Sequence, residues 1–332
     1  ENDPVGYHAL AKIDPIEAVV TKHGATYAQV FGQWVCDQAD TDDRLMAITP
    51  AMIGGSGLEP FAQQHATRLF DVAIAEQHAL TLAAGMACEG AKPVVAIYST
   101  FLQRGYDQLI HDIVLQDLDI LLAIDRAGVV GEDGATHTGA YDLAFLRCLP
   151  NLLVMAPSSA AETSAMLSFG FHHHGPAAVR YPRGEAFAEL PLVTPIELGK
   201  GQVLQTAIKP DALAILNFGA LLDKAIVVAE AHGTTLVDMR FVKPLDEALL
   251  HQLLNQHMGF VTIEDHSCIG GAGSAVSEWL VQQKSKVRLL CLGHEDAALP
   301  HGSRDQGLHH TGLSTTKMVA RVAEWQAQLL AE

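Results

Sequence analysis

The sequence predicts an α/β protein of two doubly wound, mostly parallel-sheet domains, and three observations support this fold class. Short apolar runs bounded by polar residues, glycine or proline recur along the chain, as is typical of strands buried on both faces. They alternate with stretches whose apolar positions recur every three and four residues, as crossover helices require. A region rich in proline and glycine, residues 184–210, divides the alternation into two parts.

The first domain is expected over residues 25–185. Residues 1–24 combine prolines and glycines with short apolar patches and indicate a linker, which an amphipathic segment over 27–36 follows. The expected strands are 45–49, 69–75, 94–98, 120–125, 152–156 and 177–181. The expected helices between them are 77–88, 102–115, 143–149 and 160–171.

The second domain is expected over residues 198–332, after a linker at 186–197. Its expected strands are 212–218, 235–239, 260–263 and 287–292. Its expected helices are 221–231, 246–257, 274–283 and 315–330. The alternation again predicts a doubly wound sheet, smaller than the first.

Composition excludes several classes of protein. Hydrophobic residues make up 49% of the 332 residues and charged residues 18%, which excludes a disordered tail and a charged coiled coil. A net charge of -17 opposes binding to nucleic acid or to an anionic membrane. No apolar run approaches the roughly 18 residues of a membrane span.

Five cysteines without a C-x-x-C pair indicate neither a disulfide framework nor a zinc site, so a reducing, cytoplasm-like compartment is expected. The chain starts Glu1-Asn2-Asp3-Pro4 without an initiator methionine. We therefore expect it to be a piece of a longer protein.

The first candidate site residue is Glu76. Ligands of an open α/β sheet bind at the carboxyl ends of its strands, so residues just past each strand are the candidates. Glu76 lies between an apolar strand and an apolar helix. It is either a half-buried carboxylate presented to a ligand nitrogen or a carboxylate that the helix dipole favours.

Three further strand ends carry candidates. Residues 98–104 place Tyr98, Phe101 and Arg104 near a helix start, although Ser99 or Thr100 could simply cap that helix. Residues 125–139 form a glycine-rich loop that contains the side chains Arg126, Asp133 and His137. Residues 180–184 add Arg180 and Arg183, which suit a phosphate or form a solvated surface pair.

Four strings at these ends carry a resemblance to a known family: D-V-A-I-A-E-Q-H-A, I-Y-S-T-F-L-Q-R-G-Y-D-Q, D-R-A-G-V-V-G-E-D-G-A-T-H-T-G-A-Y-D and R-Y-P-R-G. With L-V-D-M-R-F-V-K-P-L-D and G-G-A-G-S-A further on, they make the chain similar to transketolase-like thiamine diphosphate enzymes. The resemblance covers the pyrimidine-binding and C-terminal domains of that family. It implies that a preceding domain holds the cofactor diphosphate through Mg²⁺, because the family's Gly-Asp-Gly motif is not found here.

The resemblance also implies an activity. It is the thiamine-diphosphate-dependent condensation of pyruvate with D-glyceraldehyde 3-phosphate, with loss of CO₂, to 1-deoxy-D-xylulose 5-phosphate, a precursor of isoprenoids, thiamine and pyridoxal. A homodimer is implied, and both a bacterial cytosol and a plastid stay open. The chain alone, without the diphosphate and metal site, is expected to be inactive.

The implied roles fall on residues named above. Glu76 would hydrogen-bond the aminopyrimidine ring of the cofactor and Phe101 would pack on it. Arg104, Arg126 and Arg183 would bind substrate, with Arg126 and Arg183 on the phosphate. The remaining residues, Tyr98, Asp133 and His137, would surround the reacting carbons, and His137 could move a proton.

Two patterns and three alternatives accompany this interpretation. His172-His173-His174 suggests a metal ligand tract but is more simply a surface run, and no metal ligand is predicted in this chain. Gly270-Gly271-Ala272-Gly273 matches a dinucleotide fingerprint only weakly, because Val276 replaces its last small residue. The alternatives are a split transketolase, a beta-type subunit of a 2-oxoacid dehydrogenase, and a stand-alone dinucleotide-binding or interaction module.

Overall fold

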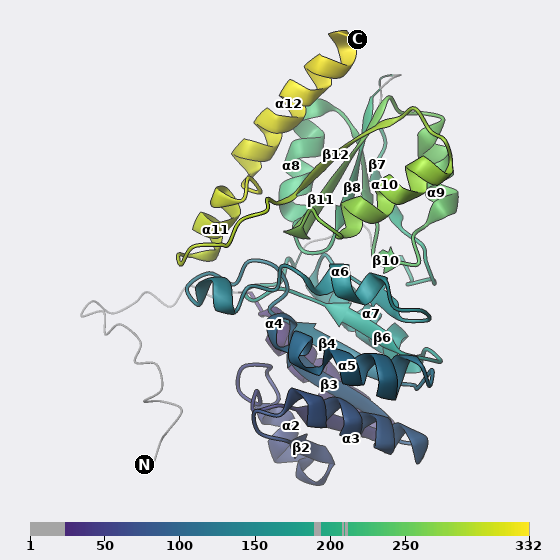
Figure 1. Cartoon of the computed structure of the whole chain (residues 1–332). Coiled ribbons are helices and arrows are strands. Elements are labelled where there is room, and N and C mark those ends of the chain that lie inside the picture. Colours follow the sequence, from purple (N-terminus) through teal and green to yellow (C-terminus); the bar gives the residue numbers. More distant parts are fainter. Residues whose placement is uncertain (1–23, 189–193, 208, 210–211, 332) are drawn as a thin grey trace, which may run out of the picture.

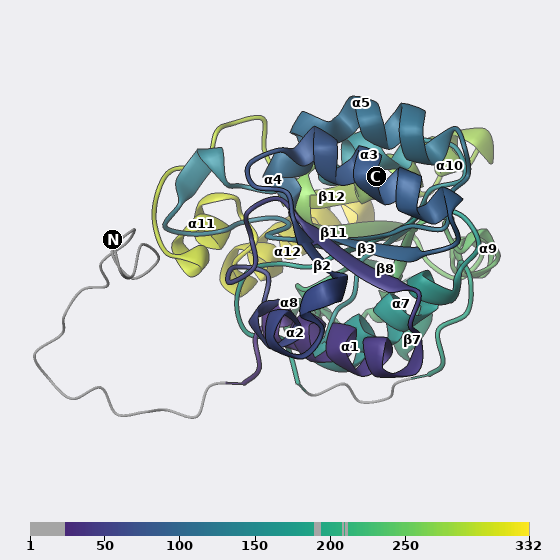
Figure 2. The ribbon, with the colours of Figure 1, turned by 90° about the horizontal axis from the view of Figure 1, so that it is seen from below.

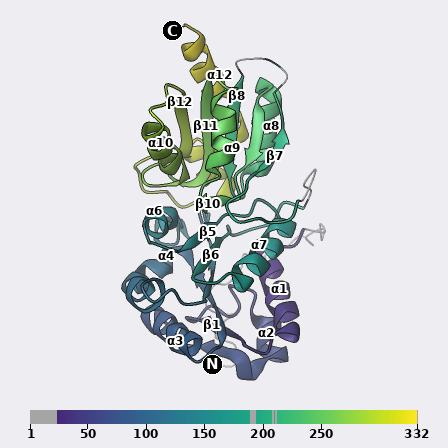
Figure 3. The same cartoon turned by 90° about the vertical axis from the view of Figure 1, so that its right-hand side faces the viewer.

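The chain folds around two β-sheets that lie one above the other (Figures 1 and 3). The computed structural model describes residues 24–188, 194–207, 209 and 212–331. Within them the larger sheet has the strand order β10-β5-β6-β4-β3-β1-β2 and the smaller β12-β11-β8-β9-β7. All strand pairs are parallel except β10–β5 and β7–β9. The predicted class, α/β with two mostly parallel sheets, is confirmed.

The larger sheet contains all six strands predicted for it and one that was not. Its strands are β1 (Leu45–Thr49), β2 (Leu69–Asp71), β3 (Lys92–Tyr98), β4 (Leu121–Asp125), β5 (Leu153–Met155), β6 (Ala177–Arg180) and β10 (Phe241–Lys243). The expected strand 69–75 is too long, because the chain turns at Ala73, whose φ is 56°. Asp71 stabilises this turn, since its Oδ1 accepts the N–H of Ala51 and of Ala73, each at 2.9 Å.

Helices cover both faces of the larger sheet, as Figure 2 shows. One face carries α1 (Tyr27–Thr41), α2 (Glu59–Gln64) and α7 (Ala160–His172). The other carries α3 (Glu76–Cys88) and a helical run made of α4 (Ser99–Leu102), η2 (Gln103–Gly105), α5 (Tyr106–Gln108) and η3 (Leu109–Val114). Short elements complete this part: η1 (Ala66–Arg68), η4 (Gly134–Thr136) and α6 (Asp142–Arg147). Thr26 and Gln29 start α1 with reciprocal capping hydrogen bonds.

The smaller sheet belongs to the C-terminal part of the chain. Its strands are β7 (Gln202–Gln205), β8 (Leu213–Phe218), β9 (Thr235–Asp238), β11 (Gly259–Ser267) and β12 (Arg288–His294). Its helices are α8 (Leu222–His232), α9 (Glu247–Leu254), α10 (Ala272–Gln282), α11 (Arg304–His310) and α12 (Thr315–Ala331). The sequence did not predict β7, β10, α2 or α11, all of which are short. No helix of the described ranges is long and apolar enough to cross a bilayer.

The two sheets share an apolar core. One cluster of buried side chains runs from Ile97 and Ile124 of the larger sheet, through Leu143 and Leu146 of α6, to Phe260 of the smaller sheet. Strand β10 adds a second link, because it follows β9 of the smaller sheet in the chain yet pairs with β5 of the larger one. Apart from Gly24, the linker expected over 1–24 lies outside the described residues.

Candidate active site

All eight side chains that the sequence predicts for the site line a single cavity of about 660 Å³. They are Glu76, Tyr98, Phe101, Arg104, Arg126, Asp133, His137 and Arg183. They follow the carboxyl ends of β2, β3, β4 and β6, and residues after β1 complete the wall. These five strands are neighbours in the sheet, so the cavity lies where ligands of open α/β sheets bind.

Glu76 is a buried carboxylate at the wall of this cavity. It is the first residue of α3 and is 3% exposed. Its Oε2 accepts a hydrogen bond from Nη1 of Arg104 at 3.2 Å, and the Arg104 side chain is 57% exposed. A carboxylate confined this deeply needs a partner, and among the described residues that partner is Arg104, itself half in solvent. Glu76 therefore lies both at a helix start and on the wall of the cavity.

Phe101 lies between two other rings of the site. Its ring stacks on Tyr98 with centroids 5.6 Å apart and meets His137 edge-on at 5.3 Å. Neither Ser99 nor Thr100 caps the helix here, because the N-cap of α4 is Tyr98, without a side-chain cap bond. The Thr100 hydroxyl instead donates to the carbonyl of Thr136, which joins this turn to the loop before α6.

Each arginine of the cavity pairs with a carboxylate. Besides Arg104 with Glu76, Arg183 Nη1 lies 2.6 Å from Asp133 Oδ2, and Arg126 bonds Asp125. The side chain of Arg183 is 42% exposed, whereas that of Arg126 is 16% exposed. Arg104 and Arg183 therefore offer more accessible guanidinium surface to an anion than Arg126 does.

Arg126 is held by several groups at once. Its Nη1 also donates to the carbonyl of Gly55, and its guanidinium lies 4.2 Å from the ring centre of Tyr98. Burial raises the pKa of Asp125 to about 6, although the neighbouring Arg126 lowers it. Burial also raises the pKa of Tyr98, again against the effect of Arg126. The backbone of Arg126 has a φ of 58°, so Arg126 is one of three non-glycine residues in the left-handed region at these strand ends, with Ala51 and Ala73.

Several residues that line the cavity or support its wall were missed from the sequence. Gly55 is needed because a Cβ there would lie 1.8 Å from the Tyr98 hydroxyl. Asp71 organises the strained turns of Ala51 and Ala73 beside the cavity. The run Gly54-Gly55-Ser56-Gly57, which begins five residues after the first buried strand ends, is the signal that could have pointed to this turn. Met52, Ile74 and Gln103 line the cavity itself.

Arg180 does not belong to this site, although the sequence grouped it with Arg183. It is 4% exposed, and its Nε donates to Asp142 Oδ2 at 2.7 Å. Its Nη2 donates to the carbonyl of Asp265 at 3.1 Å. It is a buried contact between the two sheets.

The glycine-rich segment before α10 does not form a dinucleotide site. The Glu264 carboxylate accepts the N–H of Ala272 at 2.6 Å and of Gly273 at 2.8 Å. A Cβ at Gly271 would lie 2.3 Å from Glu264 Oε2. The helix N-terminus that a pyrophosphate would need is therefore occupied by the chain's own carboxylate.

The three histidines at the end of α7 have separate surroundings. His172 contacts the carbonyl of Ser168 through Nδ1, and His174 lies 3.3 Å from Asp119. Among the described residues no group of three or more His, Cys, Asp or Glu is placed to bind a metal ion.

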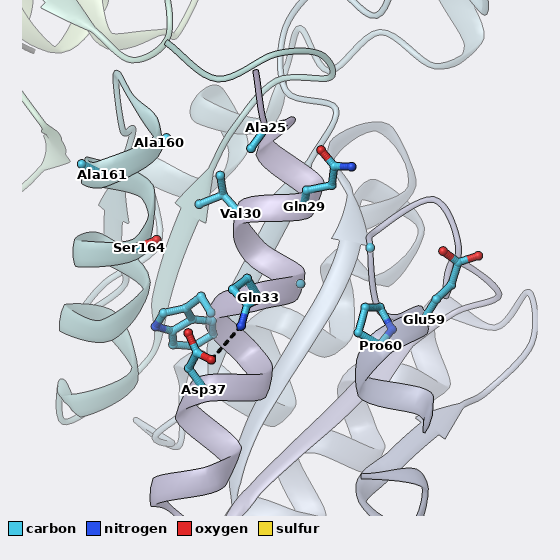
Figure 4. A pocket seen from close by; sticks show the side chains of 13 residues that line it. Ala25, Gln29, Val30, Gln33, Asp37, Glu59, Pro60, Ala160, Ala161 and Ser164 are labelled. Atoms are coloured by element: carbon cyan, nitrogen blue, oxygen red, sulfur yellow. Dashed lines mark hydrogen bonds between the residues drawn. The ribbon is translucent and has the colours of Figure 1, made fainter. Parts of the chain in front are cut away.

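A second, larger hollow of about 810 Å³ lies between α1, α2 and α7 (Figure 4). Its wall includes Gln33 and Asp37, which hydrogen-bond each other at 2.8 Å. None of the eight predicted site residues lines it. The predicted site residues therefore gather around the smaller cavity and not around this hollow.

Comparison with known proteins agrees with this geometry. Residues 23–187 match the family "Transketolase, pyrimidine binding domain", and residues 199–318 match "Transketolase, C-terminal domain". The chain belongs to the transketolase family, of which it contains these two domains.

The more specific similarity is to 1-deoxy-D-xylulose-5-phosphate synthases. The chain is 53% identical to the enzyme of that name from Pseudomonas entomophila (strain L48) over 99% of its own length and 52% of the relative. It is 54% identical to that of Pseudoalteromonas translucida (strain TAC 125) over 94% of its length and 51% of the relative. The chain thus spans about half the length of the curated relatives it matches.

Solved structures show the same two-domain arrangement. A structure titled "Split gene transketolase, inactive beta4 tetramer" superposes with a TM-score of 0.79 at 27% identity, over 91% of this chain and 98% of that one. Transketolase from Campylobacter jejuni superposes with a TM-score of 0.74 at 16% identity, over 90% of this chain and 46% of that one, which shows the fold alone.

Proposed function

We propose that this chain forms the pyrimidine-binding half of an active site that condenses pyruvate with D-glyceraldehyde 3-phosphate to 1-deoxy-D-xylulose 5-phosphate and CO₂. The observation that carries the proposal is the convergence of eight side chains, from the ends of four strands, on one cavity. The high identity to synthases of that name, over nearly the whole chain, supports the choice of substrates.

The cavity suits the pyrimidine part of thiamine diphosphate. Glu76 provides a buried carboxylate that can hydrogen-bond a ring nitrogen, and Phe101 provides a flat apolar surface for a heteroaromatic ring. When bound, the cofactor would supply the electron sink for the decarboxylation of pyruvate. Glu76 would hold the proton at the pyrimidine nitrogen and so set the protonation state of that ring.

The exposed cations of the cavity suit the phosphate of the acceptor. Arg183 lies at the rim of the cavity, and its fork geometry matches a phosphate dianion. Arg126 would bind the same phosphate from the cavity wall. Its side-chain contacts with Asp125 and Gly55 use Nη1, and the guanidinium is held in place by stacking on the Tyr98 ring. Arg104 would bind substrate beside Glu76.

Three other groups would surround the reacting carbons. His137 lies against Phe101, where its imidazole can take up or release a proton. Asp133, paired with Arg183, would orient a substrate hydroxyl, and Tyr98 would position the acceptor through its phenol.

The metal and diphosphate site would lie in another part of the longer protein. Ile74, which lines the cavity, is 72% exposed, so one edge is open to a further domain. We propose that this domain brings the Mg²⁺ ligands, that the enzyme is a homodimer, and that it works in a bacterial cytoplasm. The chain alone would then be inactive.

A CO₂-release assay tests the proposal. The 332-residue chain and the longer protein are each supplied with thiamine diphosphate, Mg²⁺, pyruvate and glyceraldehyde 3-phosphate. We expect CO₂ only from the longer protein and only with both substrates. Turnover by the chain alone would contradict the split of the site. Consumption of a ketose phosphate in place of pyruvate, without release of CO₂, would favour a transketolase, the activity named for one structural relative.

A further inference from the structure

The loop between β4 and α6 brings three site residues to the cavity. It runs from Arg126 to Tyr141 and carries Asp133 and His137 near its tip. Its neck is closed by two hydrogen bonds between Gly128 and Gly139, of 2.8 and 2.9 Å. Beyond this neck the loop contains the short turn η4 and is bonded to its own domain by Thr100 and Arg183, and further contacts come from the C-terminal domain.

Strand β11 of the smaller sheet contacts both ends of this loop. The Asp265 Oδ1 atom accepts the N–H of Val129 at 3.0 Å. The N–H of Ser267 donates to the carbonyl of Ala140 at 3.0 Å, and His266 Nε2 accepts the N–H of Leu143 at 3.1 Å. The C-terminal domain thereby fixes where the loop leaves the larger sheet and where it returns.

Asp265 lies directly against the loop backbone. A Cβ at Gly128, whose φ is 78°, would lie 2.2 Å from the carboxyl carbon of Asp265. Two cationic or proton-donating side chains hold this carboxylate: His294 Nε2 donates to Oδ1 at 2.8 Å, and Arg304 Nη2 donates to Oδ2 at 2.9 Å. Burial would raise the pKa of Asp265, but these donors keep it well below its ordinary value, so the carboxylate is charged.

The far side of the loop also rests on the C-terminal domain. The His301 ring lies where a Cβ at Gly134 would be, 2.5 Å from it, and its Nδ1 contacts the carbonyl of Glu132 at 3.0 Å. Val129 is 2% exposed and belongs to the apolar cluster under α8 and α12. The C-terminal domain therefore contacts the loop at both of its ends and at its tip, although none of that domain's described residues lines the cavity.

We propose that Asp265, itself fixed by His294 and Arg304, is a positioning residue through which the C-terminal domain sets the place of Asp133 and His137 in the cavity. Its charged carboxylate binds the loop backbone where the loop begins. The expected effect on turnover rests on the proposed function, whereas the expected effect on the mobility of the loop does not.

Hydrogen exchange of the backbone amides in the 332-residue chain tests the mechanical part. Asp265→Asn keeps the size of the side chain but removes its charge, and Arg304→Gln removes one of its two supports. Loss of a hydrogen bond to a charged group predicts amide exchange over residues 129–137 at least about tenfold faster in Asp265→Asn. A smaller acceleration is expected in Arg304→Gln, because that side chain is 28% exposed.

Asp246→Asn is the matched control. Asp246 is also a buried carboxylate of the C-terminal part and is 5% exposed. It accepts the N–H groups of Leu249 and Gly201, which do not belong to the loop. It should change exchange around α9 and leave residues 129–137 as in the unmodified chain. Unchanged exchange of these amides in both loop variants would overturn the proposal. If Asp265→Asn does not fold, Arg304→Gln decides.

The catalytic part is tested in the longer protein by separating kcat from cofactor affinity. Glu76 and Phe101 come from other strand ends, so the Kd of thiamine diphosphate should change less than about threefold in Asp265→Asn, while kcat falls at least about tenfold. Equal loss of both would indicate general destabilisation and overturn the positioning role. Absence of any synthase turnover in the unmodified protein would refute the proposed function and leave the exchange result intact.

Discussion

Replacing Glu76 by glutamine separates its chemical role from its structural one. The change keeps the shape of a side chain that is 3% exposed and removes its charge. Loss of a positioned acid–base group predicts a fall in turnover of roughly 10²- to 10⁴-fold in the longer protein. Stability should change by less than about 1 kcal/mol, because the lost ion pair with the half-exposed Arg104 is weak and a buried charge is removed.

The assay measures kcat from CO₂ release and the midpoint of urea unfolding for the same variants. Glu59→Gln is the control, since Glu59 is also in the first turn of a helix but is exposed and outside the cavity. It should keep both turnover and stability near those of the unmodified protein. Turnover of Glu76→Gln within tenfold of the unmodified enzyme, or unfolding of that variant, would refute the assignment and leave Glu76 a helix-start residue.

Two stability predictions concern the packing of the C-terminal domain, one of them where Val129 of the β4–α6 loop joins its apolar cluster. Val129→Ala should lower the free energy of unfolding, measured in urea, by about 1.5–2.5 kcal/mol, because it removes two buried methyl groups. The control Val227→Ala, at a side chain that is 46% exposed, should lower it by less than about 0.5 kcal/mol. Equal losses in the two variants would mean that Val129 is not part of the core. Burial raises the pKa of Glu264 from 4.5 to about 7, against the hydrogen bonds from Gly273 and Ala272. The stability that the protonated Glu264 carboxyl contributes is full below pH 4.5 and is lost as the pH rises through 7. Glu264→Gln should therefore reduce the fall in the free energy of unfolding between pH 5 and 8 by up to about 3 kcal/mol. An identical pH slope in the two proteins would contradict this.

The sequence alone determined the elements with a strong local pattern. The run from Leu45 to Ile48 is continuously apolar, and with Thr49 it forms β1 with the predicted bounds, because continuous apolarity is typical of a strand buried on both faces. The same logic predicted a helix over 77–88 after a strand, and so placed Glu76 at the carboxyl edge of the sheet, although β2 ends earlier, at Asp71. Residues of the site could be predicted because each follows such a strand.

Elements that depend on distant partners could not be predicted. Strand β10 has only three residues and forms because it pairs with β5. The paired residues Phe241 and Met155 are 86 positions apart in the sequence. The expected strand 69–75 stops at Asp71, since this carboxylate binds the backbone of a turn that local apolarity does not reveal. In both places a tertiary contact outweighed the local preference.

Tertiary structure also decided which charged residues face the cavity. Arg180 and Arg183 are three positions apart and look equivalent in the sequence, but Asp142 holds the first inside the protein while the second reaches the cavity. Asp265 carried no sequence signal, and only the packing of one domain on the other brings its carboxylate to the loop of Asp133. Local pattern determines where a chain forms strands and helices, whereas the partner of each charge depends on contacts between segments far apart in the sequence.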